Sequence, residues 1–405
     1  MIGDKRFIEK IKINNISSFG PDSEEIELKS LNVLVGPNAS GKSNFIEVIK
    51  MLKAMPTDIR SFVNTSGGPS ELLWKGGEGN TTGIISTQIY YPLTHPQTSA
   101  VHNFTFGRKF LFSFYVTSEN IILSNNDIIY TNADGKGKFT TEEAPFDISK
   151  IRKEDAEASV AKFRDEEIDH FQSILSQRKG PDYFGLTFIA LNYSRIKVFS
   201  QFDINSSLRN PQRTDMPDDF LEENASNLNM IINDLDHNYP KVINDIEKIL
   251  GDLTNNFSKM NIKLHAGMAQ LFFKEIINNK EVVIHANRLS DGTLKFLCLL
   301  IVLFHPKPPP LICIEEPEAG LHPDMIPIIA DLLVDASHRT QLIVTTHSDI
   351  LIDALTKTPE AVIVCEKHEG STTMRRLDEK KLKAWLKKYS LGELWRKGEI
   401  GGNRW

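Results

Sequence analysis

A single glycine-rich turn constrains the fold of this chain more than any other feature. The apolar run Leu31–Val35 leads directly into Gly36–Ser43, which reads GPNASGKS and fits the pattern GxxxxGK[ST] at every fixed position. The residues that follow Lys42 have the spacing of an amphipathic helix. A buried strand, a glycine turn and a helix in this order predict a phosphate-binding loop, because the backbone N–H groups and the helix dipole then face one anion.

The side chains of this loop indicate a nucleotide as the ligand. Lys42 would reach the β- and γ-phosphate oxygens, and the Ser43 hydroxyl would ligate Mg²⁺. We therefore expect the nucleotide to contact Gly36, Pro37, Asn38, Ala39, Ser40, Gly41, Lys42, Ser43 and Asn44.

Two later strands end in residues that suit phosphate chemistry. Residues 310–323 read PLICIEEPEAGLHP, an apolar strand that delivers Glu315 and Glu316 at its carboxyl end, where α/β proteins place ligands. We expect Glu315 to hold the metal through water and Glu316 to orient the attacking water. Residues 341–349, QLIVTTHSD, form a further buried strand ending at His347, which we expect to contact the γ-phosphate.

A third anion site is predicted at the start of the apolar helix Leu294–Phe304. The preceding residues read LSDGT, and a helix N-terminus with Ser290 and the flexible Gly292 suits a phosphate. A Ser-Asp-Gly turn is also a common helix cap, so the motif gains meaning only from its position in the order of motifs. Its residues are Leu289, Ser290, Asp291, Gly292 and Thr293.

Composition narrows the class of protein. The chain of 405 residues, 40% hydrophobic and 25% charged, is typical of a globular protein of about two to three domains. A formal charge of −6 argues against a generally basic nucleic-acid-binding protein. The longest apolar stretch, Leu294–Phe304, is about half of the ~20 residues that a bilayer span needs. Three cysteines lack metal-ligand spacing. We expect a cytoplasmic protein with no membrane contact.

The remaining pattern predicts a mixed fold. Residues 287–377 alternate helix and strand, which is typical of βαβ units on a parallel sheet. Further strands are expected at Glu9–Ile13, Glu25–Lys29, Ile84–Tyr91, Phe104–Val116, Ile121–Thr131 and Leu186–Asp203, a hairpin over Ile262–His285 with its turn at Asn278-Asn279, and helices near 147–178 and 218–257.

Taken in order, the motifs GPNASGKS, LSDGT, IEEPEAGLHP and TTHSD resemble the ATP-binding-cassette (ABC) class of ATPases. Within it they look most like the cytosolic AAA-type branch of SMC, RecF and OLD proteins, over roughly residues 7–50 and 287–366. Two positions depart from the commonest pattern of the class. Asp291 replaces a glycine of the signature, and Glu315 stands where an aspartate is usual.

The resemblance implies a fold and a domain plan. We expect an α/β ABC-type P-loop ATPase head, with a mixed sheet, an antiparallel β subdomain, a helical insertion lobe and no long coiled coil. Residues 1–146 would form the N-terminal ATPase lobe, 147–260 a mostly helical insertion, 261–366 the C-terminal ATPase lobe and 367–405 a basic tail.

The resemblance also implies a mechanism that uses ATP and Mg²⁺. Two copies would pair head-to-tail, with the Gly36–Ser43 loop of each facing the Leu289–Thr293 signature of the other across one ATP. Lys42, Glu316 and His347 would be the catalytic groups, and hydrolysis would release the homodimer.

Chain length separates the possible members of the class. The 245 residues between the loop and the signature exceed the transporter spacing, yet the 32 residues of 147–178 would make an arm of only about 50 Å. Only 58 residues follow His347, too few for a nuclease domain, and the Asp234-Leu235-Asp236 pair lacks a matching glutamate strand. We expect a stand-alone ATPase that controls a separate effector, a nuclease or toxin, in anti-phage defence. A RecF- or SMC-like DNA-binding ATPase in repair or recombination is the alternative.

The C-terminal segment stands apart in charge. From Glu366 to Trp405 there are eleven Lys or Arg against six Asp or Glu, and three of the four tryptophans of the chain. Aromatic and arginine side chains are typical of binding hot spots. Trp385, Trp395, Arg396 and Trp405 therefore have three open readings: packing on the ATPase lobe, docking of an effector, or contact with DNA.

Overall fold

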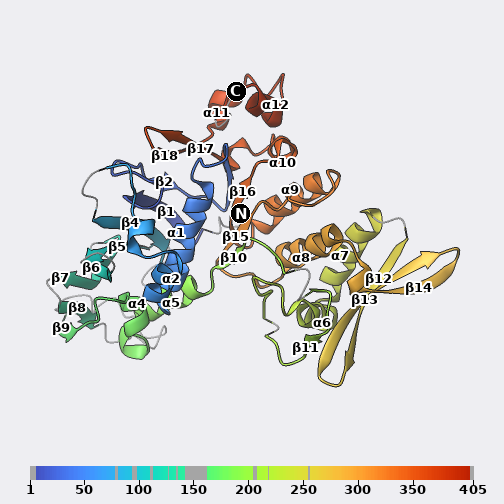
Figure 1. The fold of residues 1–405 in the computed structure, drawn as a ribbon, viewed down its shortest axis with the longest axis horizontal. Coiled ribbons are helices and arrows are strands. Elements are labelled where there is room, and N and C mark those ends of the chain that lie inside the picture. Colours follow the sequence, from blue (N-terminus) through green and yellow to red (C-terminus); the bar gives the residue numbers. More distant parts are fainter. Residues whose placement is uncertain are drawn as a thin grey trace, which may run out of the picture.

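A six-stranded sheet organises the molecule (Figure 1). The computed structural model describes residues 6–77, 81–93, 98–109, 113–125, 127–133, 136–141, 162–203, 208–217, 219–253 and 256–401. The strand order is β10 (Lys197–Phe199), β15 (Leu311–Glu315), β16 (Gln341–Thr346), β3 (Leu31–Val35), β17 (Val362–His368) and β18 (Ser371–Arg376). The first five strands are parallel and β18 is antiparallel to β17. The carboxyl ends of β15, β16 and β3 therefore share one edge.

Alternating side chains of this sheet enter two separate cores. Val33 and Val35 face one core, together with helices α8 (Asp291–Phe304), α9 (Met325–Ala336) and α10 (Asp349–Ala354). Leu34 and Cys313 face the other core, with α1 (Lys42–Ala54) and α5 (Phe184–Ser194). Both faces of the parallel strands are covered, which is why these strands read as continuous apolar runs.

An eight-stranded antiparallel sheet covers the α1 side, as expected for the β subdomain. Its order is β2 (Ile26–Glu27), β1 (Ile8–Asn14), β4 (Thr82–Tyr90), β5 (Ser99–Lys109), β6 (Ser113–Leu123), β7 (Ile128–Ala133), β8 (Lys136–Thr141) and β9 (Lys162–Glu167). The short helices α2 (Ile59–Thr65) and α3 (Pro69–Leu72) lie between α1 and β4 in the chain.

The insertion differs from its sequence-based prediction in two places. Residues 142–161 lie outside the described part of the chain, but 162–178, expected to be helical, contain β9 and only the short α4 (Ile174–Gln177). Pairing of β9 with β8 overrides the helix propensity of its charged sequence. The first half of the expected strand Leu186–Asp203 is helix α5 and only Lys197–Phe199 is a strand, because a short apolar run fits a buried helix as well as a strand.

The rest of the insertion follows the prediction more closely. Helices α6 (Leu228–Asn238) and α7 (Pro240–Leu253) occupy the expected helical stretch. The expected hairpin is a three-stranded unit, β12 (Phe257–His265), β13 (Met268–Ile277) and β14 (Lys280–His285), to which β11 (Gln212–Arg213) adds on β13. The turn at Asn278 and Asn279, with φ of 51° and 60°, was correctly placed. No helix of the described residues is long and apolar enough to cross a membrane, and the longest, α7 and α8, have 14 residues each.

The central sheet extends beyond Glu366, where the sequence suggested that it ends. β17 runs to His368, and β18 pairs with it along its whole length. Residues 371–376, expected in the tail, are thus an edge strand of the ATPase sheet, since their polar residues alternate with the buried Thr372 and Met374.

Candidate nucleotide-binding and hydrolysis site

The predicted phosphate loop leaves β3 and enters α1 at Lys42. Ala39 and Gly41 have φ of 62° and 101°, the left-handed region that lets the backbone curl. A Cβ on Gly41 would lie 2.2 Å from Thr372 Oγ1, and one on Gly36 would lie 2.3 Å from the Cys365 carbonyl oxygen. The loop needs glycine at these positions because the β17–β18 hairpin packs directly behind it.

A buried threonine from that hairpin supports the loop. Thr372 Oγ1 lies 3.0 Å from the Ser40 carbonyl oxygen and 2.7 Å from Ser18 Oγ, and the Thr372 N–H donates to the Ser18 carbonyl oxygen. Sequence reasoning missed Thr372, which had been assigned to the tail. The one available signal was the glycine pattern of the loop. It indicates that another segment packs closely against the loop but does not identify that segment.

Lys42 is held against the loop that it is expected to serve. Its Nζ donates to the carbonyl oxygens of Gly36 and Pro37 at 2.8 and 3.0 Å, and its side chain is almost fully buried. Burial lowers the pKa of Lys42 from 10.5, while the nearby Glu316 and Glu318 act in the opposite direction. The loop thus offers a preorganised cation next to curled backbone amides, which fits a nucleotide triphosphate.

Glu315 lies on the α1 side of the sheet. Its Oε1 accepts hydrogen bonds from Ser200 Oγ at 2.5 Å and from Lys50 Nζ at 3.2 Å. Ser200 is there because β10 runs parallel to β15, with Phe199 beside Ile314. The sequence does not identify Ser200 as a partner of Glu315, because a single strand is expected over Leu186–Asp203. Hydroxyl and carboxylate oxygens suit Mg²⁺, so Ser43 and Glu315 would hold it.

Glu316 and His347 come together as the sequence predicted. Glu316 Oε1 lies 3.5 Å from His347 Nε2, and the Glu316 carboxylate is half exposed. The Glu316 backbone has a φ of 46° and its N–H donates to the Thr345 carbonyl oxygen at 3.0 Å. Burial and the charge of Lys42 lower the pKa of His347 from 6.5, so its imidazole is neutral at pH 7. A neutral imidazole can donate a hydrogen bond beside the carboxylate.

Glu318 and Lys295 fix the loop that carries Glu316. Glu318 Oε1 accepts from Thr346 Oγ1 at 2.6 Å and from the His347 N–H at 3.0 Å. Lys295, on the first turns of α8, donates from Nζ to the carbonyl oxygens of Glu316 and Ala319 at 3.2 and 2.7 Å. Burial lowers the pKa of Lys295. Neither residue was identified from the sequence, because both contacts join segments that are remote in the chain.

The signature residues form the N-terminus of α8. Ser290 caps the helix by accepting from the Thr293 N–H at 3.0 Å, and Leu289 is buried. A Cβ on Gly292 would approach the Gly320 carbonyl oxygen to 3.0 Å. Among the described residues, no hydrogen bond or ion pair joins 289–293 to the 36–44 loop of the same chain.

Most of the described tail packs on the ATPase core. Helix α12 (Leu391–Arg396) begins in a Ser390–Glu393 capping box and buries Leu391 and Leu394 in the core that contains α10. Trp395 packs against this core, and Arg396 Nη1 pairs with Asp349 on α10 at 2.6 Å. Trp385, after α11 (Glu379–Leu382), is 45% exposed, and Trp405 lies outside the described residues. Of the predicted contact residues, Trp385 is the best placed to meet a partner.

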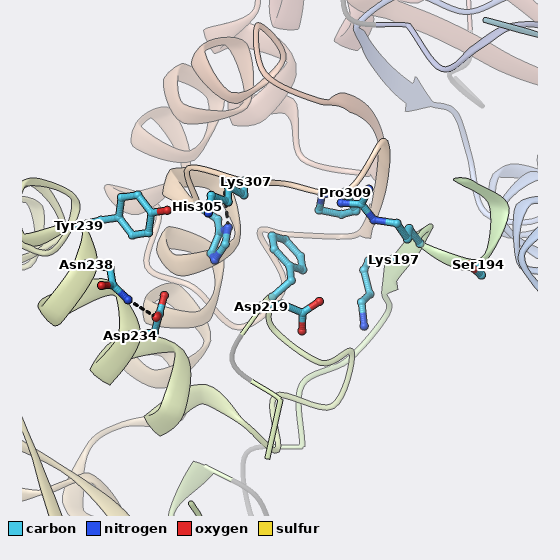
Figure 2. A pocket seen from close by; sticks show the side chains of 11 residues that line it. Ser194, Lys197, Asp219, Asp234, Asn238, Tyr239, His305, Lys307 and Pro309 are labelled. Atoms are coloured by element: carbon cyan, nitrogen blue, oxygen red, sulfur yellow. Dashed lines mark hydrogen bonds between the residues drawn. The ribbon is translucent and has the colours of Figure 1, made fainter. Parts of the chain in front are cut away.

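A separate cavity of about 770 Å³ lies away from these groups. Figure 2 shows His305 beside Lys307, with Asp219, Asp234 and Lys197 around the same space. Its lining includes no residue of the phosphate loop, the signature, the Glu315-Glu316 pair or His347. Asp234, weighed above as a possible nuclease ligand, accepts from Asn238 Nδ2 at 2.6 Å. No group of three or more potential metal-binding side chains occurs among the described residues.

His305 in this cavity predicts a pH dependence of stability. Its ring is 4% exposed, Nδ1 accepts from the Lys307 N–H at 3.2 Å, and burial lowers its pKa from 6.5. The unfolded chain therefore binds more protons than the folded one below pH 6.5, so stability falls as the pH falls. In urea unfolding at pH 7.5 and 5.5, we expect His305→Gln to reduce the difference between the two midpoints. The exposed control His265→Gln should leave that difference unchanged; a wild-type difference in both variants would contradict the assignment.

The fold is that of an SMC-like ABC ATPase head, and the loop after β3 has the form of a P-loop. The chain belongs to the family described as "AAA domain, putative AbiEii toxin, Type IV TA system", whose model matches residues 31–353. No curated protein matches the chain.

Solved structures support the fold. An Smc head bound to the C-terminal winged-helix domain of ScpA aligns over 93% of this chain and 99% of its own, with a TM-score of 0.58 and 16% identity. An Smc head domain with an extended coiled coil, bound to the C-terminal domain of ScpA and derived from Pyrococcus furiosus, aligns over 94% and 98%, with a TM-score of 0.56 and 13% identity. The α/β ATPase-head fold expected from the sequence is confirmed.

Proposed function

We propose that this protein binds and hydrolyses ATP between two copies of the chain and acts as a nucleotide switch for a separate effector protein. The observation that carries the proposal is the cluster of Lys42, Glu316 and His347 at one edge of the sheet. A loop lysine, a half-exposed carboxylate and a neutral imidazole are the groups that γ-phosphate cleavage requires.

Each residue would have a distinct part in hydrolysis. The amides of residues 36–44 and the Lys42 ammonium would bind the phosphates, and Ser43 and Glu315 would hold Mg²⁺, which would supply charge neutralisation at the phosphates when bound. Glu316 would accept a proton from the attacking water, and His347 would donate a hydrogen bond to the γ-phosphate. These roles use only side chains that meet at the ends of β3, β15 and β16.

The signature supports a dimer rather than a monomer as the active form. Residues 289–293 present a capped helix N-terminus that, among the described residues, makes no hydrogen bond or ion pair with the chain's own 36–44 loop, so its anion site is available to a second copy. Binding of two ATP molecules would join the copies and hydrolysis would release them, which gives two discrete states that a partner can sense.

The biological role is inferred from the family description and from the exposed segment around Trp385. The family description includes a toxin of a Type IV toxin–antitoxin system. We infer an ATPase that controls a separate nuclease or toxin in anti-phage defence. The effector would meet the exposed segment around Trp385, whose lysines, Lys380, Lys381, Lys383, Lys387 and Lys388, are mainly solvent-exposed.

The segment around Trp385 also supports a second candidate function. Five lysines around an exposed tryptophan suit a phosphate backbone as well as an acidic protein, so a RecF- or SMC-like DNA-binding ATPase is the alternative.

The decisive experiment uses the Glu316→Gln protein, which should bind ATP without turning it over. In light scattering with ATP and Mg²⁺ it should form a dimer, and without ATP it should be a monomer. A Lys42→Ala/Glu316→Gln control should stay monomeric in both conditions. If Glu316→Gln stays monomeric at saturating ATP, the switch proposal is wrong. Binding to duplex DNA that weakens steeply with salt would favour the alternative function.

A further inference from the structure

An arginine outside all of the sequence motifs holds the signature loop. Arg209 lies between β10 and β11 in the chain, and its Nη1 donates to the carbonyl oxygens of Asn287 and Leu289, both at 2.8 Å. Its Nη2 makes an ion pair with the Asp291 carboxylate. The Arg209 guanidinium thus contacts the backbone at the start of the signature and the Asp291 side chain within the signature. The planar fork of arginine suits such a multiple contact, which a lysine could not reproduce.

Asp291 is the position where the signature departs from the common glycine. Its side chain is 67% exposed at the N-terminus of α8, in the part of the loop expected to face a triphosphate. An acidic group there favours its own helix dipole. It would also repel the phosphates, because like charges within a few ångströms oppose binding. An uncompensated Asp291 would therefore weaken the interface across ATP.

Arg209 supplies the missing compensation. Its side chain is only 22% exposed, and it is neighboured by the Asp291 carboxylate and two backbone carbonyl groups, so its position is fixed by three contacts. The ion pair cancels the charge of Asp291 at the edge of the signature. The aspartate and the arginine then act together as a neutral and rigid replacement for glycine.

We propose that Arg209 is a positioning residue of the ATP site formed in trans, where it neutralises Asp291 and fixes the signature loop for the triphosphate of the second copy. This inference rests on the proposed ATP-dependent dimer. It assigns a reason for the departure from the common signature: the acidic residue is tolerated because the insertion provides its counter-charge. Because Arg209 lies in the insertion between the two ATPase lobes, the inference also gives this insertion a role at the proposed dimer interface.

The test combines charge removal with restoration of the common residue. In the Glu316→Gln background, the ATP-dependent dimer constant would be measured by sedimentation for Arg209→Gln, Asp291→Gly and the double variant. We expect Arg209→Gln to weaken dimerisation roughly 10- to 100-fold, because a charge-assisted contact is lost and a carboxylate is left unpaired. Asp291→Gly should dimerise about as well as the parent, and the double variant should recover to within a fewfold.

A matched control separates this effect from general surface charge. Arg213, in strand β11 of the same insertion, forms an exposed ion pair with Asp215 two residues away. Arg213→Gln should therefore dimerise like the parent. Binding of ATP to the monomer at low protein concentration should be the same in all variants, which reports on folding and on the loop of residues 36–44.

Three results would overturn the inference. Parent-like dimerisation of Arg209→Gln would show that the ion pair does not act on the interface. A double variant as weak as Arg209→Gln would show that Arg209 acts through something other than the charge of Asp291. If the Glu316→Gln parent itself fails to dimerise with ATP, the proposed dimer is wrong and this inference fails with it; dimerisation of the parent together with either of the first two results overturns the role of Arg209 alone.

Discussion

Replacing Glu316 by Gln is expected to lower the rate of ATP turnover by roughly 100- to 10,000-fold, the range that loss of a general base produces. The carboxylate is half exposed and lies 3.5 Å from His347 Nε2 at the carboxyl edge of the sheet. Glutamine has the same length and keeps the backbone at this left-handed position, but it cannot accept a proton from water. ATP affinity should therefore change little, and the ATP-bound state should accumulate.

Steady-state phosphate release and equilibrium binding of ATP measure the two effects separately. Asp324→Asn is the matched control, because it removes a carboxylate that is 80% exposed eight residues further along the same connection after β15. It should retain the wild-type turnover. Turnover of Glu316→Gln within a fewfold of the wild type would exclude Glu316 as the base, and a parallel loss of ATP binding would instead indicate a structural role.

The motif residues could be brought together from sequence because of one property of parallel sheets. The strands before Gly36, Glu315 and His347 all read as short apolar runs, and parallel strands place their carboxyl ends at one edge. No knowledge of the middle of the chain was needed to predict that Glu316 and His347 would meet. The same argument failed for β10, since the helix and the strand of 184–199 follow each other with only residues 195–196 between them and share an apolar character.

The residues that support the site could not be predicted in this way. Thr372 lies behind the phosphate loop and Arg209 holds the signature, but each contact joins segments that are far apart in the chain. Their side chains carry no periodic signal, because each is a single polar residue whose partner is a backbone carbonyl group. Sequence patterns report which face of an element is buried, whereas contacts of this kind depend on how complete elements pack.

The tail shows a related limit. Its charge and its tryptophans stood out in the sequence, yet β18 belongs to the central sheet and α12 packs on α10. A segment with a net positive charge can still contribute buried leucines, because composition averages over residues that face opposite sides. Within the described part of the tail, the turn around Trp385 leaves a large aromatic side chain exposed.

Replacing Lys295 by Met is expected to lower turnover by roughly 10- to 100-fold while ATP affinity stays unchanged, since small displacements of a catalytic group cost rates of this order. Lys295 is the charged residue of the otherwise apolar segment Leu294–Phe304, and it is retained there through hydrogen bonds to the Glu316 and Ala319 carbonyl oxygens. Those bonds hold the backbone of Glu316, the proposed catalytic carboxylate, in its left-handed conformation. Methionine fills a similar volume but leaves both carbonyl groups without this donor.

Because Lys295 lies on the first turns of the helix that begins with the signature, its effect should appear in kcat rather than in KM. Lys295→Arg, which keeps the charge and the donors, should recover much of the lost rate, whereas a residue needed only for packing would be better replaced by Met than by Arg.

Lys307→Met, beyond the other end of α8, is the control and should turn over ATP like the wild type. Equal rates for Lys295→Met and the wild type would mean that the Glu316 loop keeps its geometry without α8. A reduced kcat with Arg rescue would show that the donors at position 295, on the helix that begins with the signature, support the proposed catalytic carboxylate of the same chain.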